Sequence, residues 1–172
     1  DATQIGTVIS MDHLEKVESY INLAIEEGGT ILTGGTRSMM GGVGPTPEGA
    51  YLAPTVIGGL SHLSRCATEE IFGPVVTVHT FDSLAEVTEM ANATEYGLAG
   101  SIWTRDIEVG KALAKTIDTG IVWINTWLHR DLRTPFGGVK HSGVGREGGQ
   151  WSLGFFSETT NICVMNPREL GD

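Results

Sequence analysis

The sequence of 172 residues contains little cysteine, few basic side chains and no long apolar run. Its two cysteines, Cys66 and Cys163, lie far apart without a CxxC pair, which argues against a disulfide framework or a structural zinc site and favours a reducing compartment. Eleven basic against 21 acidic residues give a net charge of −10, which argues against nucleic-acid binding. No apolar stretch approaches the roughly 20 residues of a membrane-spanning helix. We therefore expect a cytoplasmic protein that binds neither nucleic acid nor membranes.

The length and composition fit a folded domain. Hydrophobic residues make up 40% and charged residues 19% of the chain, which excludes a disordered or fibrous protein. The first four residues carry neither a secretion signal nor an initiator methionine. The chain is therefore expected to be processed or to be a piece of something longer.

Glycine is overrepresented and occurs in two clusters. Of the 24 glycines, ten fall between Gly28 and Gly59 and seven between Gly137 and Gly154. Residues 143–148 match the dinucleotide-binding pattern GxGxxG, but they do not follow a predicted strand. We interpret these glycines as serving helix entry and close packing.

The first third of the chain predicts one helix and two strands. Apolar residues recur at helical spacing over 12–27, and a short strand follows at 30–33. Residues 34–49 are predicted to form a loop or an irregular hairpin. A strand over 51–57 contains Pro54, which confines it to an edge or a bulge.

The remainder predicts an α/β fold. Ser83 and Glu86 form a capping box before a helix. Strands and helices alternate in the order strand 75–81, that helix, strand 98–104, helix 106–116 and strand 120–125. This order predicts a pair of right-handed βαβ units around a parallel sheet, with the first strand buried. A loop over 126–144, a helix over 147–156 and a final apolar strand over 159–165 complete the chain.

The cysteines are poor nucleophile candidates. Cys66 lies near Glu69 and Glu70, and nearby carboxylates raise a thiol's pKa and disfavour the thiolate. Cys163 falls in the apolar final strand. Both are expected to be structural.

Two segments are candidate sites. Residues 69–74 place two carboxylates before an aromatic residue and a Gly-Pro turn, and adjacent side chains on an extended segment point in opposite directions. A binding site and a solvated turn are both compatible with this pattern.

The second candidate is the loop over 127–138. It combines arginines with Trp127 and Phe136, which suits recognition of a planar carboxylate. The alternative explanation of these arginines is a protein interface or a surface salt bridge.

Four motifs together resemble the aldehyde dehydrogenase superfamily over essentially the whole chain. They are Glu69-Glu70-Ile71-Phe72-Gly73-Pro74-Val75, Asn92-Ala93-Thr94-Glu95-Tyr96-Gly97-Leu98-Ala99, Gly120-Ile121-Val122-Trp123-Ile124-Asn125 and Pro135-Phe136-Gly137-Gly138-Val139-Lys140-His141-Ser142-Gly143. Residues 130–136 resemble most the branch that oxidises 2-aminomuconate and 2-hydroxymuconate semialdehydes.

The resemblance implies an NAD(P)-dependent oxidation, with NAD as the expected cofactor and NADP as the alternative. In such enzymes a cysteine thiolate attacks the aldehyde, a hydride passes to the nicotinamide, and the acyl-thioester is hydrolysed. The family's Gly-Gln-x-Cys motif does not occur in this sequence, so no catalytic residue is carried over and no metal is implied. The resemblance thus implies the carboxyl-terminal part of such an enzyme, partnered by its Rossmann domain and catalytic-cysteine segment.

The resemblance also implies a division at residue 158. Residues 1–158 correspond to part of the catalytic domain, and 159–172 to an oligomerisation strand and tail that give homodimers or tetramers. The alternative function is a non-catalytic binding or oligomerisation module, because a terminal strand can add to a neighbour's sheet without chemistry.

By resemblance, three residues contact the cofactor. Glu70 is expected to hydrogen-bond the ribose hydroxyls on the nicotinamide side, Phe72 to pack beside the nicotinamide, and Leu98 to line that pocket. A carboxylate suits a diol because it accepts two hydrogen bonds.

Arg130 is the residue expected to bind the substrate. It stands where relatives that oxidise simple aldehydes commonly have an aromatic or apolar residue, so it implies a semialdehyde with a remote carboxylate. Phe136 is expected to pack on the carbon skeleton. Asp131 is a rival partner for Arg130, and Arg133 is the alternative anchor for the carboxylate.

Overall fold

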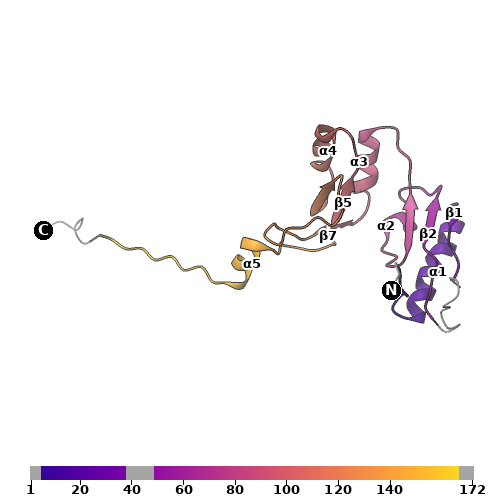
Figure 1. Ribbon diagram of the computed structural model, residues 1–172, viewed down its shortest axis with the longest axis horizontal. Helices are drawn as coiled ribbons and strands as arrows, with labels where there is room; N and C mark the ends of the chain where they lie inside the picture. The colour runs from indigo at the N-terminus through magenta and orange to yellow at the C-terminus, as the bar shows by residue number, and fades with distance from the viewer. Residues whose placement is uncertain (1–4, 38–48, 167–172) are drawn as a thin grey trace. The chain divides into compact units, whose positions relative to one another are not determined.

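The computed structural model describes residues 5–37 and 49–166 (Figure 1). The chain divides into two compact units. The first comprises Asp1–Glu95 and Lys115–Asp118, and the second Tyr96–Ala114 and Thr119–Asp172. Most of the predicted loop 34–49 lies outside the described residues. No helix in the described part of the chain is both long enough and apolar enough to span a membrane.

Within its described residues, the first unit combines three helices with a three-stranded sheet. Its elements in chain order are α1 (Met11–Glu26), β1 (Thr30–Thr33), β2 (Thr55–Gly58), α2 (Arg65–Thr68), β3 (Val75–Val78) and α3 (Leu84–Asn92). The strand order is β1-β2-β3, with β1 antiparallel to β2 and β2 parallel to β3.

Helix α1 confirms the predicted helix to within one residue at each end. The Ser10 hydroxyl accepts a hydrogen bond from the backbone N–H of His13 at 3.1 Å and caps the helix. One face is fully or almost fully buried through Leu14, Val17, Ile21 and Ala24. This spacing explains why the amphipathic pattern predicted the helix correctly.

The core of the first unit lies between α1 and the sheet. One cluster of buried residues consists of Leu14, Val17, Ile21, Leu52 and Ile71, and a second of Ala24, Ile57, Leu60 and Cys66. Burial of each large apolar side chain is worth about 1.5–3 kcal/mol relative to its exposed state. The segment that carries Ile71 is therefore anchored in the core directly beside a candidate site.

Two strand predictions need correction. The strand expected over 51–57 begins only at Thr55, so Pro54 lies outside the ladder and β2 takes the central position of the sheet. The strand expected to be buried over 75–81 spans Val75–Val78 and is half exposed, with Val76 53% and Val78 44% accessible in this chain. Its valines alternate between two faces, and only one of these packs on α1.

The capping box of α3 is confirmed with one difference. The Ser83 hydroxyl accepts from the Glu86 N–H at 3.1 Å. The Glu86 carboxylate accepts from the N–H of Asp82, at 2.7 Å, one residue earlier than in the standard box.

The second unit is built on a βαβ motif. Its elements are β4 (Tyr96–Gly97), β5 (Ala99–Ile102), α4 (Ile107–Ala114), β6 (Ile121–Ile124), β7 (Val139–Lys140) and α5 (Gly149–Phe156). Strands β5 and β6 are parallel, and β4 pairs with β7 in antiparallel fashion. The predicted pair of βαβ units sharing one sheet is thus only partly present, because β3 pairs with β2 and not with β5.

The final apolar segment forms no strand in the single chain. Residues 158–166 carry neither helix nor strand and are exposed, and Figure 1 shows them as an extended trace after α5. The strand predicted over 159–165 therefore has no pairing partner among the described residues.

Candidate functional site

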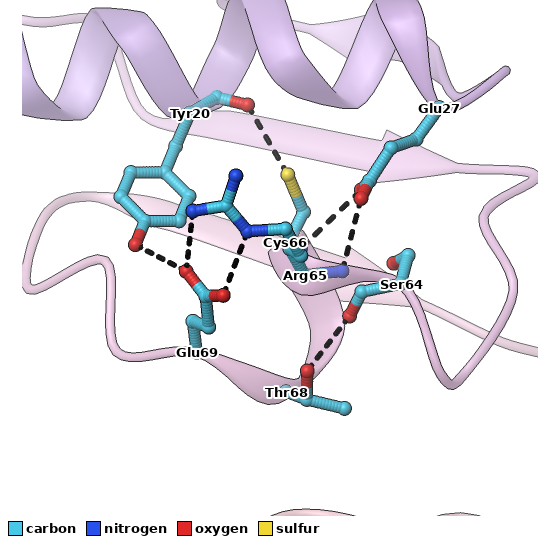
Figure 2. A network of polar contacts seen from close by, with 7 residues as sticks. All are labelled: Tyr20, Glu27, Ser64, Arg65, Cys66, Thr68 and Glu69. Carbon is cyan, nitrogen blue, oxygen red and sulfur yellow. Dashed lines mark hydrogen bonds and ion pairs between the residues drawn. The ribbon is translucent and has the colours of Figure 1, made fainter.

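The segment after α2 is fixed by the carboxylate of Glu69 (Figure 2). Its Oε1 accepts from Arg65 Nε at 2.7 Å, and its Oε2 accepts from Arg65 Nη2 at 3.1 Å and from the Tyr20 hydroxyl at 2.7 Å. The Arg65 guanidinium and then the Tyr20 hydroxyl lower the pKa of Glu69 to about 2. Glu69 therefore stays ionised and joins α1, α2 and the following loop.

Cys66 is a structural residue. It is 4% exposed, and its thiol donates to the backbone oxygen of Tyr20 at 3.2 Å. Burial, followed by the charge of Glu27, raises its pKa to about 11. Glu27 also accepts from the backbone N–H groups of Arg65 and Cys66, at 3.1 and 3.4 Å (Figure 2). The burial of Cys66 agrees with the expectation of a structural residue, although burial and Glu27, more than Glu69 or Glu70, raise its pKa.

Glu70 and Phe72 follow Glu69 and project from the core. Glu70 is exposed, and its carboxylate makes no hydrogen bond to residues 5–37 or 49–166. Phe72 is 73% exposed and adopts φ +59°, the left-handed region that L-residues rarely occupy. Glu69 thus belongs to the network with Arg65 and Tyr20, whereas the Glu70 side chain is accessible.

In the second unit, Arg130 lies against Phe136 and Glu147. The Phe136 and Glu147 backbones form a bridge with N···O distances of 2.9 and 2.8 Å. Arg130 Nη2 donates to Glu147 Oε1 at 2.7 Å, and its Cζ lies 4.1 Å from the centroid of the Phe136 ring. The arginine thus stacks on the aromatic ring that was expected to share its site.

Arg133 and Asp131 form a separate exposed pair. Arg133 Nη2 and Nε donate to Asp131 Oδ2 and Oδ1 at 2.5 and 2.9 Å, and the Arg133 side chain is 88% exposed. The guanidinium lowers the pKa of Asp131. The proposed rivalry of Asp131 for Arg130 is wrong, because Asp131 is occupied by Arg133.

A cavity of about 520 Å³ lies next to the stacked arginine. Its walls include Leu98, Phe136, Glu147, Ser152, Phe155 and Phe156. The structure thus brings together Leu98 and Phe136, which the sequence assigned to the cofactor and the substrate respectively. Arg130 contacts two residues of these walls, Phe136 and Glu147. Glu70 and Phe72 belong to the first unit.

Sequence reasoning missed Glu147, which it placed at the start of a helix. Gly148, the next residue, does serve close packing, since a Cβ on it would lie 2.3 Å from the backbone oxygen of Thr134. The contact of His13 Nε2 with the Phe72 carbonyl oxygen, at 2.6 Å, was also missed. The spacing of His13, Lys16, Val17 and Tyr20 along one helical face was its only signal.

The comparisons with known proteins settle the family. The profile of the Aldehyde dehydrogenase family matches residues 1–162. The chain belongs to the aldehyde dehydrogenase family. It is 49% identical over 170 residues to a 2-aminomuconic 6-semialdehyde dehydrogenase of a Pseudomonas species, covering 99% of this chain and 34% of that protein. It is 47% identical over 163 residues to a 2-hydroxymuconic semialdehyde dehydrogenase of Pseudomonas sp. strain CF600, covering 92% and 32%.

Solved aldehyde dehydrogenase structures share this fold. The betaine aldehyde dehydrogenase of Staphylococcus aureus, crystallised in complex with NAD+, superposes with a TM-score of 0.84 at 40% identity. That match covers 91% of this chain and 31% of the crystallised chain. This chain therefore spans about a third of the length of the aldehyde dehydrogenases that it matches.

Proposed function

We propose that this chain is part of an NAD-dependent aldehyde dehydrogenase that oxidises a carboxylated semialdehyde of the muconic type to the acid. Support comes from the identity of 49% and 47% to enzymes named for muconic semialdehydes. The remaining parts of the enzyme are then its Rossmann domain and its catalytic-cysteine segment, which are partners of this chain.

The residues of the first unit fit a nicotinamide cofactor. A bound nicotinamide cofactor supplies the hydride acceptor for oxidation of an aldehyde. The exposed Glu70 carboxylate has both oxygens available to accept hydrogen bonds from a ribose diol. The exposed ring of Phe72, two residues later, offers an apolar surface beside it. Leu98 is the third residue proposed to contact the cofactor.

The stacking of Arg130 on Phe136 carries the substrate assignment. The Arg130 side chain is 35% exposed, and its Nη2 donates to Glu147 Oε1. A planar guanidinium has further N–H groups that can hold a carboxylate through charge-assisted bonds. Arg133 is a weaker candidate, because its donors face Asp131 and it is 88% exposed. We therefore assign the substrate carboxylate to Arg130 and the carbon skeleton to Phe136.

Replacing the two arginines separately tests this assignment in the complete enzyme. Arg130→Ala is expected to lower kcat/KM for a carboxylated semialdehyde about ten- to a hundredfold, the equivalent of losing a charged hydrogen bond worth about 1.5–3 kcal/mol. An uncharged aldehyde of the same length should lose much less. Arg133→Ala is the matched control and should leave the ratio between the two substrates unchanged. A selective loss with Arg133→Ala, or an equal loss on both substrates with Arg130→Ala, contradicts the assignment.

Residues 159–172 are proposed to mediate homo-oligomerisation. The side chains of Ile162, Val164 and Met165 are 80%, 82% and 66% exposed in the single chain. An apolar extended segment of this kind gains stability by joining the edge of a neighbour's sheet. A dimer or tetramer is the expected assembly.

A further inference from the structure

One face of helix α1 contacts the loop at residues 69–73. The four residues of this face are spaced as i, i+3, i+4 and i+7, which places them on one side of a helix. They are His13, Lys16, Val17 and Tyr20. The loop contains Glu70 and Phe72, the two residues proposed to contact the cofactor.

Three of these contacts hold the loop at its ends and beside Glu70. The Tyr20 hydroxyl binds the Glu69 carboxylate at 2.7 Å. Lys16 Nζ donates to the backbone oxygen of Glu70 at 3.3 Å, which leaves the Glu70 side chain accessible. Gly73 packs so closely on Val17 that an added Cβ would lie 2.7 Å from a Val17 methyl group. The loop backbone is therefore held against the helix along its length.

His13 makes the contact closest to Phe72. Its Nε2 lies 2.6 Å from the backbone oxygen of Phe72. A carbonyl only accepts, so Nε2 carries the proton and donates. The two rings also meet edge to face, with centroids 6.1 Å apart. Because Phe72 adopts φ +59°, its conformation costs energy that the surrounding contacts must offset.

We propose that this face of α1 positions the cofactor-contacting loop, and that His13 is a positioning residue that holds Phe72 in its left-handed conformation through the Phe72 carbonyl. The inference rests on the proposed cofactor roles of Glu70 and Phe72. It assigns no contact with the cofactor to His13 itself. The contact thereby holds the Phe72 ring and the Glu70 carboxylate in a fixed geometry before a ligand binds.

The test uses the complete enzyme and four variants. His13→Leu removes the donor, whereas His13→Gln keeps an N–H donor at the end of its side chain. Tyr20→Phe removes one of the bonds to Glu69 and gives an independent readout if His13→Leu does not fold. His62→Leu is the matched control, because His62 lies beside β1 and β3 at a different cavity. Hydrogen exchange of peptides covering residues 69–75 is measured together with KM for NAD and kcat.

The His13→Leu variant lacks one hydrogen bond. We therefore expect its KM for NAD and the exchange rate of its loop peptide to rise about 3- to 10-fold. kcat should change less than KM, and His13→Gln should restore both quantities. Tyr20→Phe should also speed exchange, and His62→Leu should match the wild type. Unchanged loop exchange in His13→Leu, or equal behaviour of the Leu and Gln variants, overturns the proposal.

Glu70→Gln separates this inference from the proposed function. If Glu70→Gln leaves the affinity for NAD and the hydride-transfer rate unchanged, the cofactor role of the loop is wrong. Loop exchange in the His13 variants still reports on positioning in that case. If Glu70→Gln impairs NAD use while His13→Leu changes neither exchange nor KM, only the positioning role of His13 fails.

Discussion

Gly120 offers a steric test of the substrate site. It precedes β6 and donates its N–H to the backbone oxygen of Gly97 at 3.1 Å. A Cβ added at Gly120 would lie 1.6 Å from the backbone oxygen of Gly137, the residue after Phe136. Non-bonded atoms pack at about 3.5–4.0 Å, so the two segments must separate by more than about 1 Å. The effect is steric, because Gly120 has no positive φ.

We expect Gly120→Ala to displace Phe136 and the cavity beside it. A misplacement of about 1 Å can lower the rate on the order of a hundredfold, so kcat/KM of the complete enzyme should fall by that factor for charged and uncharged aldehydes alike. Overpacking should also cost about 1–3 kcal/mol and lower the thermal unfolding midpoint. Steady-state kinetics and thermal unfolding measure both quantities.

Gly100→Ala in the neighbouring strand β5 is the matched control. The nearest atom to its added Cβ is Thr119 Cγ2 at 3.8 Å, an ordinary contact. Its stability should remain within about 0.5 kcal/mol of the wild type, and its activity should be retained. If Gly120→Ala keeps wild-type kcat/KM, or if the two alanine variants behave alike, the close approach of Gly120 and Gly137 does not determine the geometry of this site.

Three further predictions concern other parts of the molecule. The 172-residue chain alone should produce no NADH from an aldehyde, because it lacks the Gly-Gln-x-Cys motif; turnover by the homogeneous chain would contradict this. In the folded enzyme, Cys66 should resist iodoacetamide at pH 8, because its pKa is about 11 and the thiol dominates; peptide mass analysis before and after unfolding measures this, and labelling as fast as a free thiol refutes it. Deleting residues 159–172 should yield monomeric or insoluble protein, and a soluble deletion variant with the parental oligomer mass by light scattering would exclude the assembly role.

Local patterns predicted helix α1 and the capping box of α3 well, because both depend on residues close in sequence. The spacing of apolar residues defines the buried face of α1, and Ser83 needs only the N–H of Glu86, three residues later. The burial of β3 was predicted wrongly, because a run of valines describes strand propensity and not the number of covered faces. The central position of β2 in the sheet depends on the strands that pair with it. The residues of β2 alone do not reveal those partners.

The candidate site was predictable in composition but not in pairing. Arg130 and Phe136 were assigned to one site, and the structure stacks them. The partner of Arg130 is Glu147, 17 residues away, which a local pattern does not reveal. Asp131 turns toward Arg133 because its carboxylate also accepts the Arg133 N–H at 2.9 Å, as in turns that begin with aspartate.

The contacts between α1 and the loop at residues 69–73 have a consequence for folding kinetics. His13 and Phe72 are 59 residues apart in sequence, and Tyr20 and Glu69 are 49 apart. Contacts of this separation require closure of a long chain segment, so they form slowly compared with the turns of α1 itself. The helix can exist early, but the loop acquires its geometry only when the sheet has brought its segment back to α1. A substitution that delays sheet assembly is thus expected to delay the geometry of this loop as well, even when the finished protein is unchanged.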